Sequence, residues 1–141
     1  MRLVVTIGMR ARSARARVLL ASAAAITAVA LAGCGSSKPG YCTDRTSLEN
    51  SVKGLTSASI STLKSQLTQI QSDATALVNS AKSDFPSQTS AISSSVSALK
   101  NSVTALPSSP SAAQIATVTK DAANVVSSVK SFTDATSSQC S

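Results

Sequence analysis

The three cysteines are the side chains with the most distinctive chemistry in this chain of 141 residues. Thiolates are nucleophiles that form thioethers and disulfides. Cys34 follows an apolar stretch and two small residues, whereas Cys42 and Cys140 stand near the two ends of the region after it. This spacing predicts one task for the first cysteine and a shared task for the other two.

The first 33 residues have the three parts of an export signal. Five arginines precede an apolar stretch, Val18 to Ala32, and the small residues Ala32 and Gly33 stand directly before Cys34. As a helix these 15 residues would cover about 22 Å, and a permanent membrane span needs roughly 20 residues. We therefore expect a cleaved signal peptide over residues 1–33 rather than an uncleaved membrane anchor.

The end of this leader, Leu31-Ala-Gly-Cys34, resembles the lipobox of bacterial lipoproteins. The resemblance implies that a lipoprotein signal peptidase recognises Leu31, Ala32 and Gly33 and cuts before Cys34. It also implies that the Cys34 sulfur carries diacylglycerol as a thioether. Two or more acyl chains are enough for stable anchoring, so we expect the chain on the extracytoplasmic face of a bacterial cell membrane.

A short tether and one domain are expected after the cleavage site. Residues 34–41 contain the run Gly35-Ser-Ser-Lys-Pro-Gly40, and its composition is typical of a flexible linker. Residues 42–141 then form the folded domain. Because the tether is short, this domain should stay close to the membrane surface.

Charge and composition exclude several classes of function. The net charge of +7 includes the five arginines of the leader, so the remainder of the chain carries only +2. That balance offers no basic stripe for nucleic acid. The chain has no histidine, which is the commonest catalytic base and metal ligand.

Apolar spacing predicts an all-α domain despite a composition rich in hydroxyl groups. From Cys34 onward 39 of 108 residues are Ser or Thr, which by itself would also allow disorder or a glycosylated stalk. Apolar residues nevertheless recur at alternating intervals of three and four, as on one face of a helix. They form three series: Ile60, Leu63, Leu67, Ile70, Ala74, Leu77 and Ala81; Ile92, Val96, Leu99, Val103 and Leu106; and Ile115, Val118, Ala122, Val125, Val129 and Phe132.

Capping residues and prolines set the expected helix boundaries. Thr46-Ser-Leu-Glu49 has the form of a capping box, Gly54 interrupts the apolar set that follows, and Pro86 suits a first helical turn. Ser109 is the expected N-cap of the last helix, with Pro110 at its first position. We predict an antiparallel bundle with one short helix, at about 45–54, and three long ones, at about 58–83, 87–106 and 111–136.

Cys42 and Cys140 are expected to form a disulfide, which is the default for a cysteine pair in an oxidising compartment. Unpaired thiols or a bond between two chains are the alternatives. In a bundle of three long antiparallel helices, the start of the first helix and the end of the third lie at opposite ends of the bundle. The disulfide therefore requires residues 43–57 to fold back along it, which fifteen residues of mixed helix and loop can do.

No catalytic or metal site is predicted, and no cofactor. The carboxylates Asp73, Asp84, Asp121 and Asp134 are scattered among polar helix positions, where they suit solvated faces better than acid–base pairs. Of the aromatic residues, Phe85 and Phe132 are expected to close the ends of the bundle. Tyr41 is expected either to cover the disulfide or to remain exposed.

The arrangement as a whole resembles small lipoproteins of high-GC actinobacteria, and this resemblance implies a location without an activity. It rests on the leader with its lipobox, Cys42-Thr-Asp-Arg-Thr-Ser-Leu, Ser83-Asp-Phe-Pro-Ser, Leu106-Pro-Ser-Ser-Pro-Ser, and Ser131-Phe-Thr-Asp-Ala-Thr ahead of Cys140. We expect a non-enzymatic binding protein with an envelope protein or glycan as partner. The alternatives are a carrier of an acyl chain or other apolar ligand in the bundle core, and a self-associating coiled coil. Ser/Thr runs at 87–97 and 108–111 are candidates for O-glycosylation.

Overall fold

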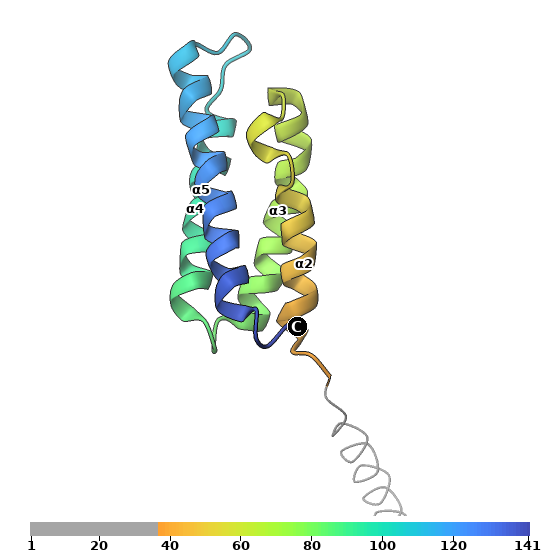
Figure 1. Cartoon of the computed structure of the whole chain (residues 1–141). Helices are drawn as coiled ribbons and strands as arrows, with labels where there is room; N and C mark the ends of the chain where they lie inside the picture. Colours follow the sequence, from red (N-terminus) through yellow and green to blue (C-terminus); the bar gives the residue numbers. More distant parts are fainter. Residues whose placement is uncertain (1–36) are drawn as a thin grey trace, which may run out of the picture. The chain divides into compact units, whose positions relative to one another are not determined.

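The computed structural model describes residues 37–141, and within this range the secondary structure is entirely helical (Figure 1). The all-α fold class predicted from the sequence is therefore confirmed. The elements are α2 (Gly40–Val52), the 3-10 turn η2 (Leu55–Ser57), α3 (Ile60–Ala81), α4 (Pro86–Thr104) and α5 (Ala112–Thr136).

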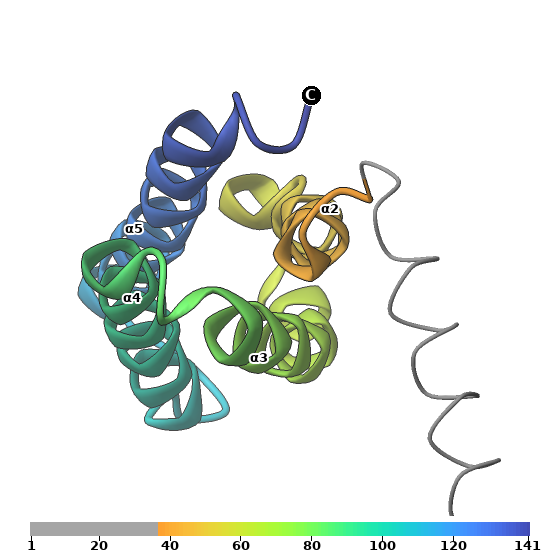
Figure 2. The ribbon, with the colours of Figure 1, turned by 90° about the horizontal axis from the view of Figure 1, so that it is seen from below.

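Successive helices run in opposite directions and stand side by side in a ring (Figures 1 and 2). α2 packs on α3, α3 on α4 and α4 on α5, while α5 closes the ring on α2 and also contacts η2. The short helix α2 has thus folded back along the longer ones, as the expected disulfide required. Lys38–Ser141 forms a compact unit of its own.

The apolar series identified in the sequence fill the space between the four helices. Most of their large members are buried, Ile60 and Leu106 are partly buried, and α2 and η2 add two leucines to them. The largest fully buried apolar residues are Leu48, Leu55, Ile70, Leu77, Ile92, Leu99, Val118, Val125 and Phe132. One member departs from the prediction, because Ile115 in the first turn of α5 is 42% exposed. α4 ends at Thr104, and the connection that follows leaves the side of α5 at Ile115 uncovered.

Three aromatic rings pack edge to face at one end of the bundle. Tyr41 from α2, Phe85 from the α3–α4 turn and Phe132 from α5 have ring centroids 5.5 to 6.2 Å apart. Edge-to-face pairs at such distances add stability beyond the area they bury. The expectation that the two phenylalanines close the ends of the bundle needs correction, since both lie at the same end. Tyr41, for which burial and exposure were both open, is 5% exposed.

The first helix begins earlier than its capping signal suggested. α2 starts at Gly40, so Gly40 and Tyr41 belong to the helix rather than to the expected tether. Thr46 lies inside it, and its hydroxyl donates to the Cys42 carbonyl instead of capping a helix start. The helix ends before Gly54, which has a φ of 74°. This left-handed conformation suits glycine, and the predicted interruption at Gly54 is confirmed.

Caps fix the starts of the long helices. Ser59 caps α3 by accepting from the Thr62 N–H at 3.3 Å, and Pro86 occupies the first turn of α4 as predicted. The expected cap of α5 at Ser109 is wrong by two residues. Ser111 caps α5 in a reciprocal capping box with Gln114, and Pro110 lies outside the helix. Two backbone N–H groups are satisfied by this box, which a cap at Ser109 would not achieve.

Candidate functional site

The predicted lipidation site lies outside the residues that the structure describes. Leu31, Ala32, Gly33 and Cys34 all fall within residues 1–36. The signal peptide and the lipid attachment therefore stay predictions from the sequence. Among the described helices, none is both long and apolar enough to cross a membrane.

The predicted pair of cysteines is joined in the structure. Cys42 in the first turn of α2 and Cys140 after the end of α5 form a disulfide, with their Cα atoms 5.4 Å apart across a sequence separation of 98. Both cysteines are buried, beside the aromatic end of the bundle. Lys38 adds a hydrogen bond from its Nζ to the Cys140 carbonyl, at 3.3 Å. Nearly the whole described chain is thus closed into one covalent loop.

A polar network crosses the contact between α2 and α5 above the disulfide. The Arg45 Nη1 donates to the Thr136 hydroxyl at 3.2 Å, and the Arg45 Nε lies 3.5 Å from Glu49 Oε1. The Thr133 hydroxyl donates to that same Glu49 oxygen. Thr136 is fully buried, whereas Arg45, Glu49 and Thr133 are half-buried. The Arg45 Nε is buried and makes no hydrogen bond to any described residue, so its contact with Glu49 is an ion pair only.

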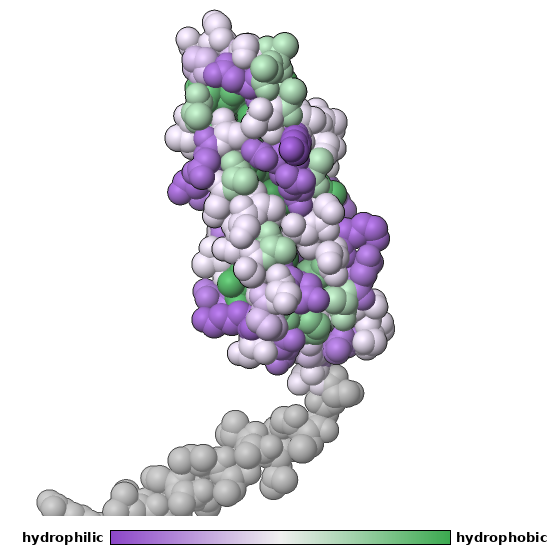
Figure 3. Space-filling model, turned by 90° about the vertical axis from the view of Figure 1, so that its left-hand side faces the viewer, coloured by the Kyte–Doolittle hydropathy of each residue, from purple (hydrophilic) through white to green (hydrophobic). Residues whose placement is uncertain are grey.

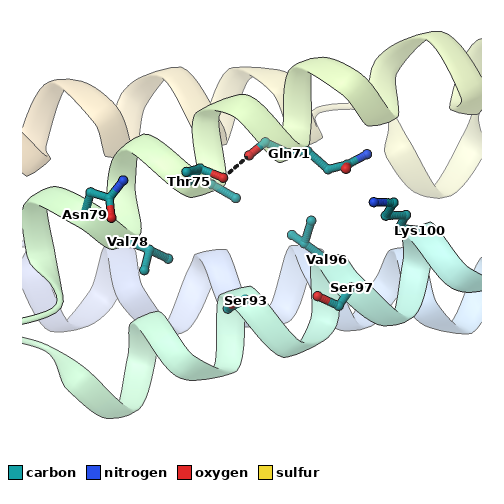
Figure 4. A pocket seen from close by; sticks show the side chains of 9 residues that line it. Gln71, Thr75, Val78, Asn79, Ser93, Val96, Ser97 and Lys100 are labelled. Atoms are coloured by element: carbon teal, nitrogen blue, oxygen red, sulfur yellow. Dashed lines mark hydrogen bonds between the residues drawn. The ribbon is translucent and has the colours of Figure 1, made fainter.

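A groove of about 280 Å³ lies between α3 and α4. Ala74 and Val96 form its buried floor. The walls come from both helices and are polar apart from Val78 (Figure 4). α3 contributes Gln71, Thr75, Val78 and Asn79, and α4 contributes Ser93, Ser97 and Lys100.

The groove is an open surface of mixed character, in which hydroxyl and amide groups stand beside the apolar Ala74, Val78 and Val96. Gln71 and Lys100 lie at one end and Asn79 at the other, with Thr75, Ser93 and Ser97 between them (Figure 4). Lys100 makes no ion pair among the residues described. The Thr75 hydroxyl donates to the Gln71 carbonyl at 2.8 Å, so its oxygen can still accept a hydrogen bond. The groove thus presents neutral donors and acceptors together with one cation.

The carboxylates expected on solvated faces serve structural contacts or lie exposed. Lys130 and Asp134 pair at 3.0 Å with both side chains largely exposed, as the sequence indicated. Asp73 accepts hydrogen bonds from Ser51 of α2 and from Gln69 of its own helix. Asp44 accepts from Ser80 at 2.6 Å. These two aspartates therefore join α2 to α3.

Comparison with known proteins adds no relative to this picture. No family model, curated protein or solved structure matches the chain. Among the described residues, no group of three or more Cys, Asp or Glu side chains gathers as a metal ion would require.

The sequence did not predict the groove. Its polar residues recur at helical spacing, Gln71, Thr75 and Asn79 on one helix and Ser93, Ser97 and Lys100 on the other. Such spacing indicates a polar strip on each helix, next to the face that carries the buried apolar residues. Because Ser and Thr cover every outer face of these helices, the pattern by itself could not distinguish a groove wall from a convex surface.

Proposed function

We propose that this chain is a non-enzymatic, lipid-anchored binding protein on the outer face of a bacterial membrane. The Cys42–Cys140 disulfide is the observation that carries the proposal. Buried disulfides that close a small domain persist in oxidising compartments outside the cytoplasm. The lipobox-like Leu31-Ala-Gly-Cys34 lies a few residues before the disulfide-closed unit, so a lipid on Cys34 would hold that unit near the membrane.

The groove between α3 and α4 is the proposed contact site, and an envelope glycan is the class of partner that it suits best. Hydroxyl and amide groups of Gln71, Thr75, Asn79 and Ser97 can exchange hydrogen bonds with sugar hydroxyls. Lys100 adds a charge for an acidic group on such a polymer. The face over α4 and α5 is mainly hydrophilic or neutral, with small, scattered apolar areas (Figure 3).

The interior favours surface contact over carriage of an apolar ligand. Side chains from all four helices fill the centre of the bundle, and the groove between α3 and α4 is open with a mixed polar and apolar lining. The carrier and the self-associating coiled coil remain predictions from the sequence. Sedimentation of the unit Lys38–Ser141 tests the coiled coil, because a monomer would exclude it.

Membrane attachment is tested by Cys34→Ser in the full chain. We expect the parent chain in the membrane fraction and the variant in the soluble extracytoplasmic fraction or uncleaved. Mass spectrometry of the parent chain should show a diacylglycerol thioether on Cys34. A parent chain that carries no lipid and leaves the membrane with mild salt would contradict the proposal.

The groove is tested by filling it. Ser97→Trp places a large ring in the groove, whereas Ser94→Trp places the same ring on an exposed part of the same helix outside the lining. The detergent-solubilised lipoprotein should co-sediment with isolated cell-wall sacculi, and only Ser97→Trp should abolish this. Equal retention of both variants on the sacculi would show that the groove is not the contact site. Site-specific photo-crosslinking from position 97 that captures a protein instead would assign the groove to a protein partner.

A further inference from the structure

The connection between α4 and α5 contains a stretch that is held by few hydrogen bonds. Residues 107–110, Pro-Ser-Ser-Pro, make no backbone–backbone hydrogen bond among the residues described. The two prolines have no N–H to donate. Ser108 and Ser109 are exposed, and neither hydroxyl has a hydrogen-bond partner in the described range. An enzyme could bind this stretch without breaking any internal bond of the protein.

Other hydroxyl groups of the bundle are held differently. Outside the α-helices, the hydroxyls of Ser57 and Ser137 donate to backbone carbonyls at 3.1 and 2.9 Å. Thr56 and Ser83 are exposed and their hydroxyls have no partner among the described residues, but each lies in a turn closed by a backbone hydrogen bond, from Ser57 to Gly54 and from Asp84 to Ala81. The exposed serines of the run 87–97 lie in α4. A transferase that takes an extended acceptor would have to unwind that helix before it could reach them.

We propose that Ser108 and Ser109 are acceptors for O-glycosylation, with a phosphate-activated sugar as the donor. Ser/Thr segments with proline are the kind of sequence that carries O-linked sugars, and the residue before a proline favours extended backbone. The serine oxygen forms a bond to the anomeric carbon as the bond from that carbon to the phosphate oxygen breaks. The phosphate departs with the electron pair, and a base of the transferase takes the hydroxyl proton.

The position of these serines suits a modification outside the cell. The α4–α5 connection lies at the opposite end of the bundle from the disulfide and the start of α2 (Figure 1). A sugar there would stand away from a membrane that holds the chain through Cys34, and it would leave the α3–α4 groove open. The inference rests on the proposed extracytoplasmic location.

Peptide mapping of the full chain, produced in an actinobacterial host, tests the site. Trypsin releases Asn101–Lys120, which contains both proposed acceptors, and Ser83–Lys100, which contains the serine run of α4. We expect hexose additions on the first peptide, located at Ser108 or Ser109 by electron-transfer fragmentation, and none on the second. The pair Ser108→Ala/Ser109→Ala should remove them, while Ser87→Ala/Ser90→Ala should leave them in place.

The same digest separates this inference from the proposed location. The peptide Cys34–Arg45, in which Pro39 protects Lys38 from trypsin, reports the lipid on Cys34. A lipidated chain whose 101–120 peptide carries no sugar, or carries phosphate instead, overturns the acceptor site alone. Sugar spread equally over both peptides also overturns it, because the unfolded chain would then be the acceptor. A chain with neither lipid nor sugar contradicts both proposals.

Discussion

Arg45 and Thr136 show how single side chains hold the short helix against the last one. A guanidinium group is costly to bury unless its N–H groups have partners. The Arg45 Nη1 donates to the buried Thr136 hydroxyl, and the Nε is paired with the Glu49 carboxylate by charge at 3.5 Å without a hydrogen bond. The Thr136 hydroxyl in turn donates to the Phe132 carbonyl at 2.8 Å. The contact between α2 and α5 therefore depends on matched polar groups as well as on apolar packing.

Thr136→Val tests this contact in the unit Lys38–Ser141. The substitution keeps the shape of the side chain but removes the acceptor of the Arg45 N–H, so unfolding in urea should show a loss of about 1–3 kcal/mol. Thr117→Val is the matched control, because Thr117 is exposed on the same helix and its hydroxyl also donates to a carbonyl four residues back. The control should change stability by less than about 0.5 kcal/mol. Equal effects would mean that the loss comes from the helix rather than from Arg45.

At the scale of the elements, periodicity predicted the helices better than local signals predicted their ends. The three apolar series lie in α3, α4 and α5, because a buried seam must keep its spacing along the whole helix. Starts depend on competition between neighbours. Ser109 and Ser111 are both good cap residues, and Gln114 decides between them. The start of α2 at Gly40 depends on Tyr41 and Cys42 packing with α5, which no local pattern of the sequence contains.

Removing each candidate cap of α5 distinguishes the two starts. Ser111→Ala should cost about 1 kcal/mol, because the Gln114 N–H loses its side-chain acceptor. Ser109→Ala should cost almost nothing. Thermal unfolding followed by circular dichroism of both variants measures the difference. A larger loss for Ser109→Ala would restore the start predicted from the sequence.

The uncovered first turn of α5 gives a second prediction at this scale. Ile115 and Val118 belong to one apolar series, yet Ile115 is 42% exposed and Val118 only 1%. Val118→Ala should therefore cost roughly 2 kcal/mol, for lost burial and the cavity left behind, and Ile115→Ala well under 1 kcal/mol. Urea unfolding of the two variants supplies the comparison. If Ile115→Ala were the more costly change, Ile115 would be buried in solution, as in a contact between two copies.

At the scale of the whole molecule, the sequence predicted the disulfide between distant residues but did not predict the groove. Both outcomes depend on how far a single feature of the sequence constrains the packing of the helices. A disulfide between Cys42 and Cys140 imposes a geometric condition on everything between them, and residues 43–57 meet it by folding back. The groove depends instead on how far apart α3 and α4 stand beside Ala74 and Val96. Interhelical spacing depends on the packing of both helices at once, so hydroxyl groups spread over every face gave no sign of it.

The disulfide is expected to hold α2 in place more than it holds α3 or α4. Closing a loop of nearly 100 residues contributes at most about 4.7 kcal/mol through the entropy of the unfolded chain. The pair Cys42→Ser/Cys140→Ser should therefore lose several kcal/mol in urea unfolding while keeping its helical spectrum. Native-state hydrogen exchange should show the largest loss of protection in α2, because α2 keeps its contacts with α3 but loses its covalent link beside α5. If protection were instead lost evenly over α2 to α5, the disulfide would act only on the unfolded chain. The contacts of Arg45, Thr136 and the aromatic rings would then be enough to hold α2 in place.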